Sequence, residues 1–247
     1  MTWPFENDTS GIVKRISNRS ISANRKRNIF IILTIALASA LLSAIVLYGF
    51  GVMQETQNRN QKTAQIMYHA ISEQQGQELY KQEEIAWVGE FFNAFSEQVN
   101  HSTVNFTYAN ADMLKSQSML YSGDLPASEN EIVVQESFLD SLGYSNELGQ
   151  TIQIPFSDGT THDFKLTGIL DVKTGDIGRY TAIISKELVR QQYGDGGMID
   201  YYIGLKGAQN MSEEEATNYA NTLAQQLKIS DDNVIVRSTY FLSLIHI

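Results

Sequence analysis

Residues that commonly carry enzyme or metal chemistry are few in this sequence and lie far apart. Its four histidines, His69, His101, His162 and His246, include no pair at the spacing of metal ligands, so each is expected to be an ordinary surface or core residue. Cysteine is absent, which excludes thiolate metal sites, thiol nucleophiles and a disulfide scaffold. We therefore predict no metal site and no catalytic residue.

Sequence motifs for nucleotide binding and for hydrolysis are also absent. The sequence contains no GxxxxGKS/T phosphate-binding loop, so this chain is not expected to bind ATP in that way. It contains no GxSxG, HExxH or SxxK motif, and no paired nucleophile and base that would support a membrane-anchored hydrolase. The glycines in residues 194–197 follow a predicted helix and precede a predicted strand, the reverse of a nucleotide-binding arrangement. We expect no cofactor and no enzyme activity in this chain.

One uncharged run dominates the first quarter of the chain. From Ile29 to Gln54, twenty-six consecutive residues carry no charge. As a helix this run would be about 39 Å long, which exceeds the hydrocarbon thickness of a bilayer, about 30 Å. We therefore predict a transmembrane helix over residues 29–53. A cleaved secretory signal is the alternative, because small-x-small sites occur at 36–38 and 38–40, but the apolar run continues well past them.

Small side chains recur on one side of this predicted helix. Ala36, Ala40 and Ala44 follow each other at intervals of four, with Ser39 and Ser43 beside them. In lipid, a face of small residues lets a second helix approach closely. These alanines are therefore a candidate helix-packing face, although alanine and serine are also simply tolerated in membrane helices.

Charge is distributed unevenly on the two sides of the apolar run. Residues 1–28 carry a net +4, from six basic and two acidic residues, and the remainder carries −14, from twelve basic and twenty-six acidic residues. The positive-inside rule predicts a protein of the cell membrane whose basic amphipathic leader is cytoplasmic and whose main domain is extracytoplasmic. The acidic main domain would repel nucleic acid, so we expect the lipid membrane, and no nucleic acid, as a partner.

After a polar stalk at 54–63, strand and helix patterns follow each other along the chain. Strands are predicted at 64–71, 87–95, 103–108, 131–134, 151–154, 163–170, 180–184, 199–205 and 233–237, and helices at 74–84, 137–142, 186–192 and 213–227. Ser212 and Glu215 form a capping box at the start of the last helix. The strand, helix and strand from 199 to 237 predict a βαβ-like unit or its split version. The whole is predicted to be an α+β domain.

The order of these elements predicts an extracytoplasmic core domain over 64–241 with two lobes. A chain that leaves the membrane and returns to it must bring its first and last segments together. We therefore predict one lobe from 64–112 plus 198–241, and a second, mostly β lobe from 113–197 inserted between them. The helix at 213–227 needs a sheet to cover, which the early strands would supply.

Several short motifs occur in an order that is similar to a known family. Residues 123–154 combine a Gly-x-Leu-Pro turn, the strand EIVV, a short helix that ends in Leu-Gly, and an LGxTI turn. The motifs LTGILD at 166–171 and YTAIISKEL at 180–188 then follow. With a basic leader that ends in RKRN and an immediate first span, the chain from about Ile12 to Phe241 resembles a MacB/FtsX-like ABC transporter permease.

This resemblance implies a MacB-like periplasmic core domain and the N-terminal part of a permease subunit. It implies two protein partners, a separate ABC ATPase subunit and a second permease copy or paralogue, which together carry out export or mechanotransmission. Permeases of this family place the outer domain between the first and second of four spans, whereas this sequence has one. Residues 242–247 are therefore expected to be a truncated or non-native tail. A single-pass membrane sensor or ligand-binding module is the alternative.

Overall fold

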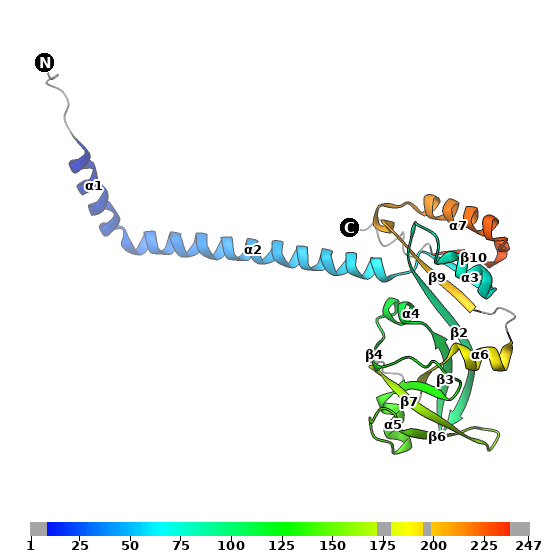
Figure 1. The fold of residues 1–247 in the computed structure, drawn as a ribbon. Helices are drawn as coiled ribbons and strands as arrows, with labels where there is room; N and C mark the ends of the chain where they lie inside the picture. Colours follow the sequence, from blue (N-terminus) through cyan, green and yellow to red (C-terminus); the bar gives the residue numbers. More distant parts are fainter. Residues whose placement is uncertain (1–8, 172–178, 195–198, 238–247) are drawn as a thin grey trace. The chain divides into compact units, whose positions relative to one another are not determined.

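The computed structural model describes residues 9–171, 179–194 and 199–237. The chain divides into two compact units, with the boundary after Thr56. The first unit contains α1 (Ser10–Ala23) and most of α2 (Arg25–Lys62), both shown in Figure 1. The stretch Arg25–Val52 of α2 is long and apolar enough to cross a membrane, which confirms the predicted long apolar helix. The expected tail at 242–247 lies outside the described residues.

The second unit is built on one mixed sheet, which has ten strands in the described ranges. The strands are β1 (Ile66–Ile71), β2 (Ile85–Val99), β3 (Ser102–Ala109), β4 (Leu120–Gly123), β5 (Glu131–Gln135), β6 (Thr151–Pro155), β7 (Thr161–Asp171), β8 (Arg179–Ile184), β9 (Ile199–Leu205) and β10 (Val234–Val236). Their order is β10-β1-β9-β2-β3-β8-β5-β7-β4, and β6 pairs with β7. The helices are α3 (Glu73–Leu79), α4 (Ala111–Ser116), α5 (Glu136–Leu142), α6 (Lys186–Tyr193) and α7 (Glu213–Leu227), with 3-10 turns η1 (Ala208–Asn210) and η2 (Asp231–Asn233). The predicted α+β class is confirmed.

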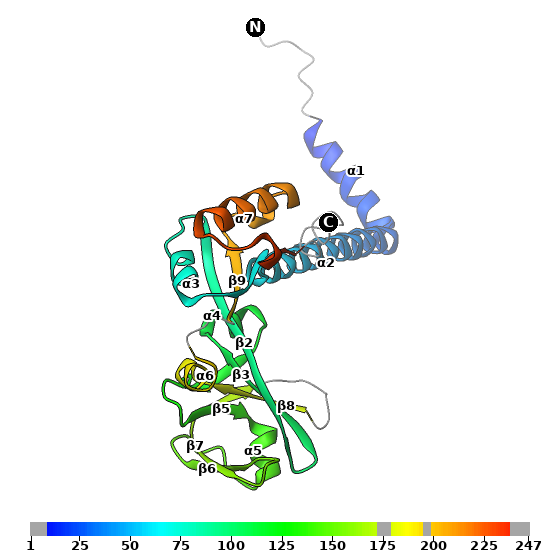
Figure 2. The ribbon, with the colours of Figure 1, turned by 90° about the vertical axis from the view of Figure 1, so that its right-hand side faces the viewer.

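The strands β9 and β10 and the helix α7 between them form a split βαβ unit. β1 pairs antiparallel with β9 on one side and with β10 on the other, so β9 and β10 run in the same direction. Tyr68 of β1 donates a hydrogen bond from its hydroxyl to the carbonyl oxygen of Ala220 in α7, at 3.0 Å. The helix begins with the predicted capping box of Ser212 and Glu215. The first strand therefore packs against the last helix. Figure 2 shows α7 beside β9, the strand that pairs with β1.

Buried apolar side chains gather in two main clusters along the sheet. The first cluster includes Ile66, Tyr68, Leu79, Ile203, Ala220 and Leu223. The second includes Phe106, Ile132, Phe138, Ile152, Leu166 and Ile184. Val104 and Phe106, which lie in the range 64–112, belong to the second cluster, so β3 contributes to packing in that part of the sheet. The division into a lobe of 64–112 plus 198–241 and a lobe of 113–197 stays a prediction.

Two short elements and the length of one strand differ from the prediction. The sequence predicts neither α4 nor β4, which have six and four residues and are too short to show a periodic pattern. The position of α4 is set by Asn110, whose Oδ1 accepts a hydrogen bond from the N–H of Met113 at 2.9 Å. β2 extends beyond the predicted 87–95 because its polar end pairs with β3 as far as Val99 and Ser102.

Turn and cap chemistry accounts for most of the remaining boundaries. Gly143 ends α5 in the left-handed conformation, with φ of 80°, as predicted. The predicted turn at Asp158-Gly159 joins β6 to β7. The predicted helix at 74–84 is wrong at its end, because α3 stops at Leu79 and the polar residues after it form turns with hydrogen bonds to carbonyls three residues back.

Candidate functional site: a charged cluster on the sheet

The sequence-predicted helix-packing residues Ala36, Ala40 and Ala44 lie in α2. All three side chains are exposed, and their spacing places them on one side of the helix. The nearby hydroxyl of Thr34 donates a hydrogen bond to the carbonyl oxygen of Phe30, at 2.8 Å, so this polar group is satisfied within the helix. Packing of the alanine face against another helix stays a prediction.

Two of the histidines, His69 and His162, make local polar contacts. Nδ1 of His69 lies 2.7 Å from Oδ1 of Asp200, and Nε2 of His162 lies 3.0 Å from the hydroxyl of Thr160. His246 lies outside the described residues. Within the described ranges, no three His, Asp or Glu side chains are grouped so that they could hold a metal ion.

The most unusual polar residue of the second unit is Glu90 in the middle of β2, which is only 4% exposed. It accepts hydrogen bonds from three side chains: the Tyr80 hydroxyl at 2.8 Å, the Tyr108 hydroxyl at 2.6 Å and the Lys186 ammonium at 2.9 Å. A buried carboxylate is costly unless it is paired and hydrogen-bonded, and Glu90 meets both conditions. Phe92, two residues further along β2, packs against both hydrophobic clusters, so Glu90 lies close to where the clusters meet.

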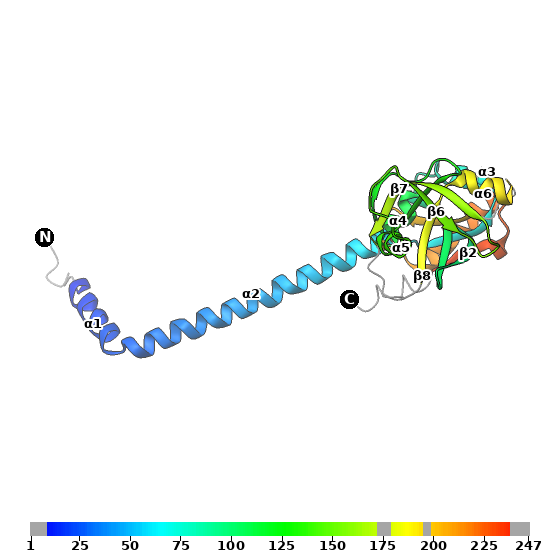
Figure 3. The same ribbon diagram turned by 90° about the horizontal axis from the view of Figure 1, so that it is seen from below.

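Two cations of α6 connect Glu90 to α3. Lys186 and Arg190 are four residues apart and therefore lie on one side of α6. The Lys186 ammonium is 2.9 Å from a carboxylate oxygen of Glu73 in α3, and the Arg190 guanidinium lies 2.6 Å from both oxygens of that carboxylate. Figures 2 and 3 show α3 and α6 on the same side of the second unit. We call Glu73, Glu90, Lys186 and Arg190 the charged cluster.

The tyrosines around the charged cluster are held in their neutral form. Burial, and then the nearby Glu90 carboxylate, raise the pKa of the Tyr80 and Tyr108 hydroxyls well above their usual range. The hydrogen bond from Arg190 holds the pKa of the Glu73 carboxyl below its usual value. The tyrosines are therefore donors at neutral pH, and Glu73 is a charged acceptor.

The side chain of Asn110 holds the backbone of β2 next to Glu90. Asn110 accepts a hydrogen bond from the Glu90 N–H at 3.0 Å, and its amide donates to the Val88 carbonyl at 2.9 Å and to the Tyr80 hydroxyl at 3.3 Å. The same side chain caps α4. The charged cluster, Tyr108 and Asn110 together connect α3, β2, β3, α4 and α6.

Sequence reasoning did not identify this cluster. One feature of the sequence indicates that Glu90 has a partner. Glu90 is a charged residue within the apolar run WVGEFF, and a charge inside a buried strand requires a partner. Its partner Lys186 is 96 residues away. The pairing depends on the sheet order, which places β2, β3 and β8 side by side.

Comparison with known proteins gives both a family and similar structures. A family model for the MacB-like periplasmic core domain matches residues 29–223. The periplasmic region of MacB from Actinobacillus actinomycetemcomitans is similar in structure, with a TM-score of 0.51 at 13% identity over 73% of this chain and 91% of that chain. The extracellular domain of YknZ, a noncanonic ABC-type transporter from Gram-positive bacteria, gives a TM-score of 0.50 at 9% identity over 71% of this chain and 100% of that chain. No match is found among curated proteins.

Proposed function

Because this chain belongs to the family of proteins with a MacB-like periplasmic core domain, we propose that it is the N-terminal part of an ABC transporter permease subunit. It contributes one membrane span and an extracytoplasmic domain to export or mechanotransmission. ATP hydrolysis takes place on a separate subunit, and a second permease copy or paralogue completes a dimer. The leader at 1–28 lies in the cytoplasm.

The observation that carries this proposal is the position of the first and last strands of the sheet. The Arg237 N–H donates a hydrogen bond to the Gln65 carbonyl at 2.8 Å, and Ile66 pairs with Val236 in the adjoining strands. The chain therefore enters and leaves the sheet at one place. A domain inserted between two consecutive membrane spans requires this arrangement, whereas a sensor domain at the end of a single span does not.

The charged cluster suits the mechanical part of this function. A displacement applied at Gln65 and Arg237 would reach β1 and β10 first and would pass through β9 to β2. α6, the helix that follows β8, forms ion pairs with Glu73 of α3 and with Glu90 of β2. These ion pairs connect α6 to this part of the sheet. Because these ion pairs are short and the carboxylate of Glu90 is buried, they resist movement of α6 relative to α3 and β2. The domain would therefore move as a rigid body when a force acts on it.

Isolation of the protein from its native membranes tests the proposal. The native gene product carries an affinity tag on the cytoplasmic leader, and the complex is crosslinked, purified and analysed by mass spectrometry. We expect an ABC ATPase subunit and a second permease chain in the complex. A matched variant replaces residues 65–237 by a short Gly-Ser linker, which the adjacent ends allow, and it should still capture the ATPase.

Two outcomes would contradict the proposal. Isolation without any ATPase, under conditions that preserve a known ABC complex of the same membrane, would favour a single-pass sensor or ligand-binding module. Loss of the ATPase only in the linker variant would place the contact with the ATPase in the outer domain, which disagrees with a cytoplasmic ATPase.

A further inference from the structure

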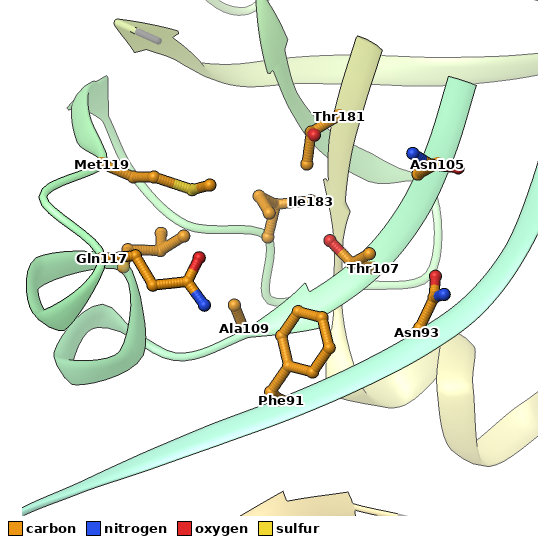
Figure 4. Close-up of a pocket in the computed structure, with 10 residues that line it drawn as sticks. Phe91, Asn93, Asn105, Thr107, Ala109, Gln117, Met119, Thr181 and Ile183 are labelled. Atoms are coloured by element: carbon orange, nitrogen blue, oxygen red, sulfur yellow. The ribbon is translucent and has the colours of Figure 1, made fainter. Parts of the chain in front are cut away.

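A pocket of about 260 Å³ lies on the face of the sheet opposite to Glu90. Its base is formed by β2, β3 and β8, and its wall is formed by α4 and the segment that follows. Figure 4 shows Thr107 and Ile183 from the strands, and Gln117 and Met119 from the opposite wall. None of the residues that form the charged cluster lines it.

The alternation of side chains along β3 produces this pocket. Phe106 is buried in the second cluster, and its neighbour Thr107 points to the other face. In the sheet, Thr107 lies opposite Asn93 of β2 and Ile183 of β8. Side chains as small as threonine leave space between the strands and α4.

The wall is held in place by a close contact between α4 and β2. A Cβ atom at Gly89 would lie 3.2 Å from the Cα atom of Met113, so the glycine allows the helix backbone to approach the strand. Asn110 fixes the start of the same helix. The elements that line the pocket therefore have defined positions.

The chemistry of the lining favours an uncharged ligand. Phe91, Met119 and Ile183 supply apolar surface, and Asn105 and Gln117 supply amide groups. Among the residues that the structure describes, no ionisable side chain lines the pocket. A charged ligand would lose its hydration without gaining a counter-charge, which is strongly unfavourable.

One polar group in the pocket lacks a partner. Thr107 is 6% exposed, and its hydroxyl oxygen is buried without a hydrogen-bond partner in the described part of the chain. A buried hydroxyl without a hydrogen-bond partner is unfavourable, and a ligand that bonds to it would recover this loss.

We propose that the pocket binds an uncharged organic molecule with an apolar body about the size of one ring and a single hydroxyl or carboxamide group. The polar group of the ligand exchanges a hydrogen bond with the Thr107 hydroxyl, and its apolar body lies against Phe91 and Ile183. This inference concerns the second unit alone and does not depend on its role in a permease.

The absence of cysteine in the chain allows a direct test by disulfide capture. In Met119→Cys, the full-length protein in nanodiscs carries one thiol at the pocket wall, and in the control Ala111→Cys it carries one on an exposed position of α4. Each variant is equilibrated with mercaptoethanol and a mixture of three symmetric disulfide probes on the same linker, which end in a benzyl alcohol, a toluene or a benzoate group. The cysteine thiolate attacks a probe disulfide, retains one half as a mixed disulfide and releases the other half as a thiol. Intact mass spectrometry measures the captured fraction of each.

We expect Met119→Cys to capture the benzyl alcohol probe about tenfold more than the toluene probe and more than the benzoate probe, whereas Ala111→Cys should capture the three probes equally and less. A tenfold preference for the alcohol over the toluene probe corresponds to about 1.4 kcal/mol, which is within the range of free energies expected for one hydrogen bond. In Met119→Cys/Thr107→Val, the preference for the alcohol over the toluene probe should disappear while capture of the toluene probe persists.

Three results would overturn the proposal. Equal capture at Met119→Cys and Ala111→Cys would mean that the pocket holds water only. Capture of the benzoate probe equal to that of the alcohol probe would show that the pocket does not prefer uncharged ligands. An unchanged preference for the alcohol in the Thr107→Val variant would show that Thr107 does not bind the ligand. Thr107→Val keeps the side-chain shape and removes an unsatisfied hydroxyl, so its thermal unfolding temperature should be unchanged or higher.

Discussion

The ammonium of Lys186 in α6 lies 2.9 Å from the carboxylate of Glu90 in β2, although the two residues are 96 positions apart in the sequence. Glu90 is buried and Lys186 is nearly so, with side-chain exposures of 5% and 18%. A pair in such a position is strongly coupled to folding, because removal of one partner leaves a charge without compensation. The stability of the second unit should therefore depend on this pair more than on its surface ion pairs.

The first prediction concerns the loss of Lys186. Lys186→Met should lower the free energy of unfolding of the second unit by about 3 kcal/mol, because the buried Glu90 carboxylate keeps only its neutral tyrosine donors. Urea denaturation of the full chain in detergent, followed by circular dichroism, measures this change. The control Lys165→Met removes an exposed partner of Glu131, at 3.4 Å, and should cost less than about 1 kcal/mol. Equal losses in the two variants would contradict the assignment of Glu90 as a buried, dependent partner.

The second prediction concerns the contact of α3 with β9. A Cβ atom at Gly76 would lie 2.0 Å from Cζ of Tyr201, and both residues are buried. Gly76→Ala should therefore destabilise the second unit by about 1–3 kcal/mol, despite the higher helix propensity of alanine. Gln77→Ala, at an exposed position of the same helix, should be neutral or slightly stabilising. A Gly76→Ala variant as stable as the parent in thermal unfolding would show that the ring of Tyr201 does not occupy this position.

The third prediction concerns pH. Because Arg190 holds the pKa of Glu73 below its ordinary value of 4.5, the folded state binds this proton more weakly than the unfolded state does. The stability that Glu73 contributes is fully present above pH 4.5 and is lost as the pH falls through the lowered pKa. In Glu73→Gln, this part of the acid dependence should disappear.

Thermal unfolding of the parent and of Glu73→Gln between pH 7 and pH 3 measures the effect. Glu187→Gln is the matched control, because Glu187 is 60% exposed and lies 3.7 Å from the same arginine. If the difference in unfolding temperature between the parent and Glu73→Gln did not shrink on acidification, the ion pair with Arg190 would not be formed in solution.

The sequence predicts the elements of this fold well where local chemistry defines them. The capping box at Ser212, the stop at Gly143 and the alternation in β3 are short-range patterns, and the structure has each of them. The sequence does not predict α4, because six residues show no helical period. For the same reason Thr107 would be assigned to a solvent-facing side of its strand, although α4 covers that side.

The charged cluster is harder to predict for a different reason. Its members lie in α3, β2 and α6, and only the parallel pairing of β3 with β8 brings α6 near β2. Strand order of this kind depends on contacts between distant segments, which local patterns do not determine. The charge of Glu90 within an apolar strand indicates that a partner exists, but not which one.

The fourth prediction concerns the orientation of the chain. Ser17→Cys in α1 and Asn221→Cys in α7 each introduce the single thiol of the chain at an exposed position. The proposed topology predicts that a membrane-impermeant maleimide added to intact cells labels Asn221→Cys and leaves Ser17→Cys unlabelled until the membrane is opened. Labelling in the reverse order would contradict the positive-inside assignment.

The length and membrane topology of the native polypeptide distinguish a permease subunit from a single-pass protein. An antibody against the second unit is used to isolate the protein from its native membranes, and its intact mass and C-terminal peptides are determined by mass spectrometry. If the chain is the N-terminal part of a permease, the native polypeptide is heavier than 27.7 kDa and continues after residue 237 into three further hydrophobic spans. A native polypeptide that ends near residue 247, or that continues into a signalling domain, would contradict it.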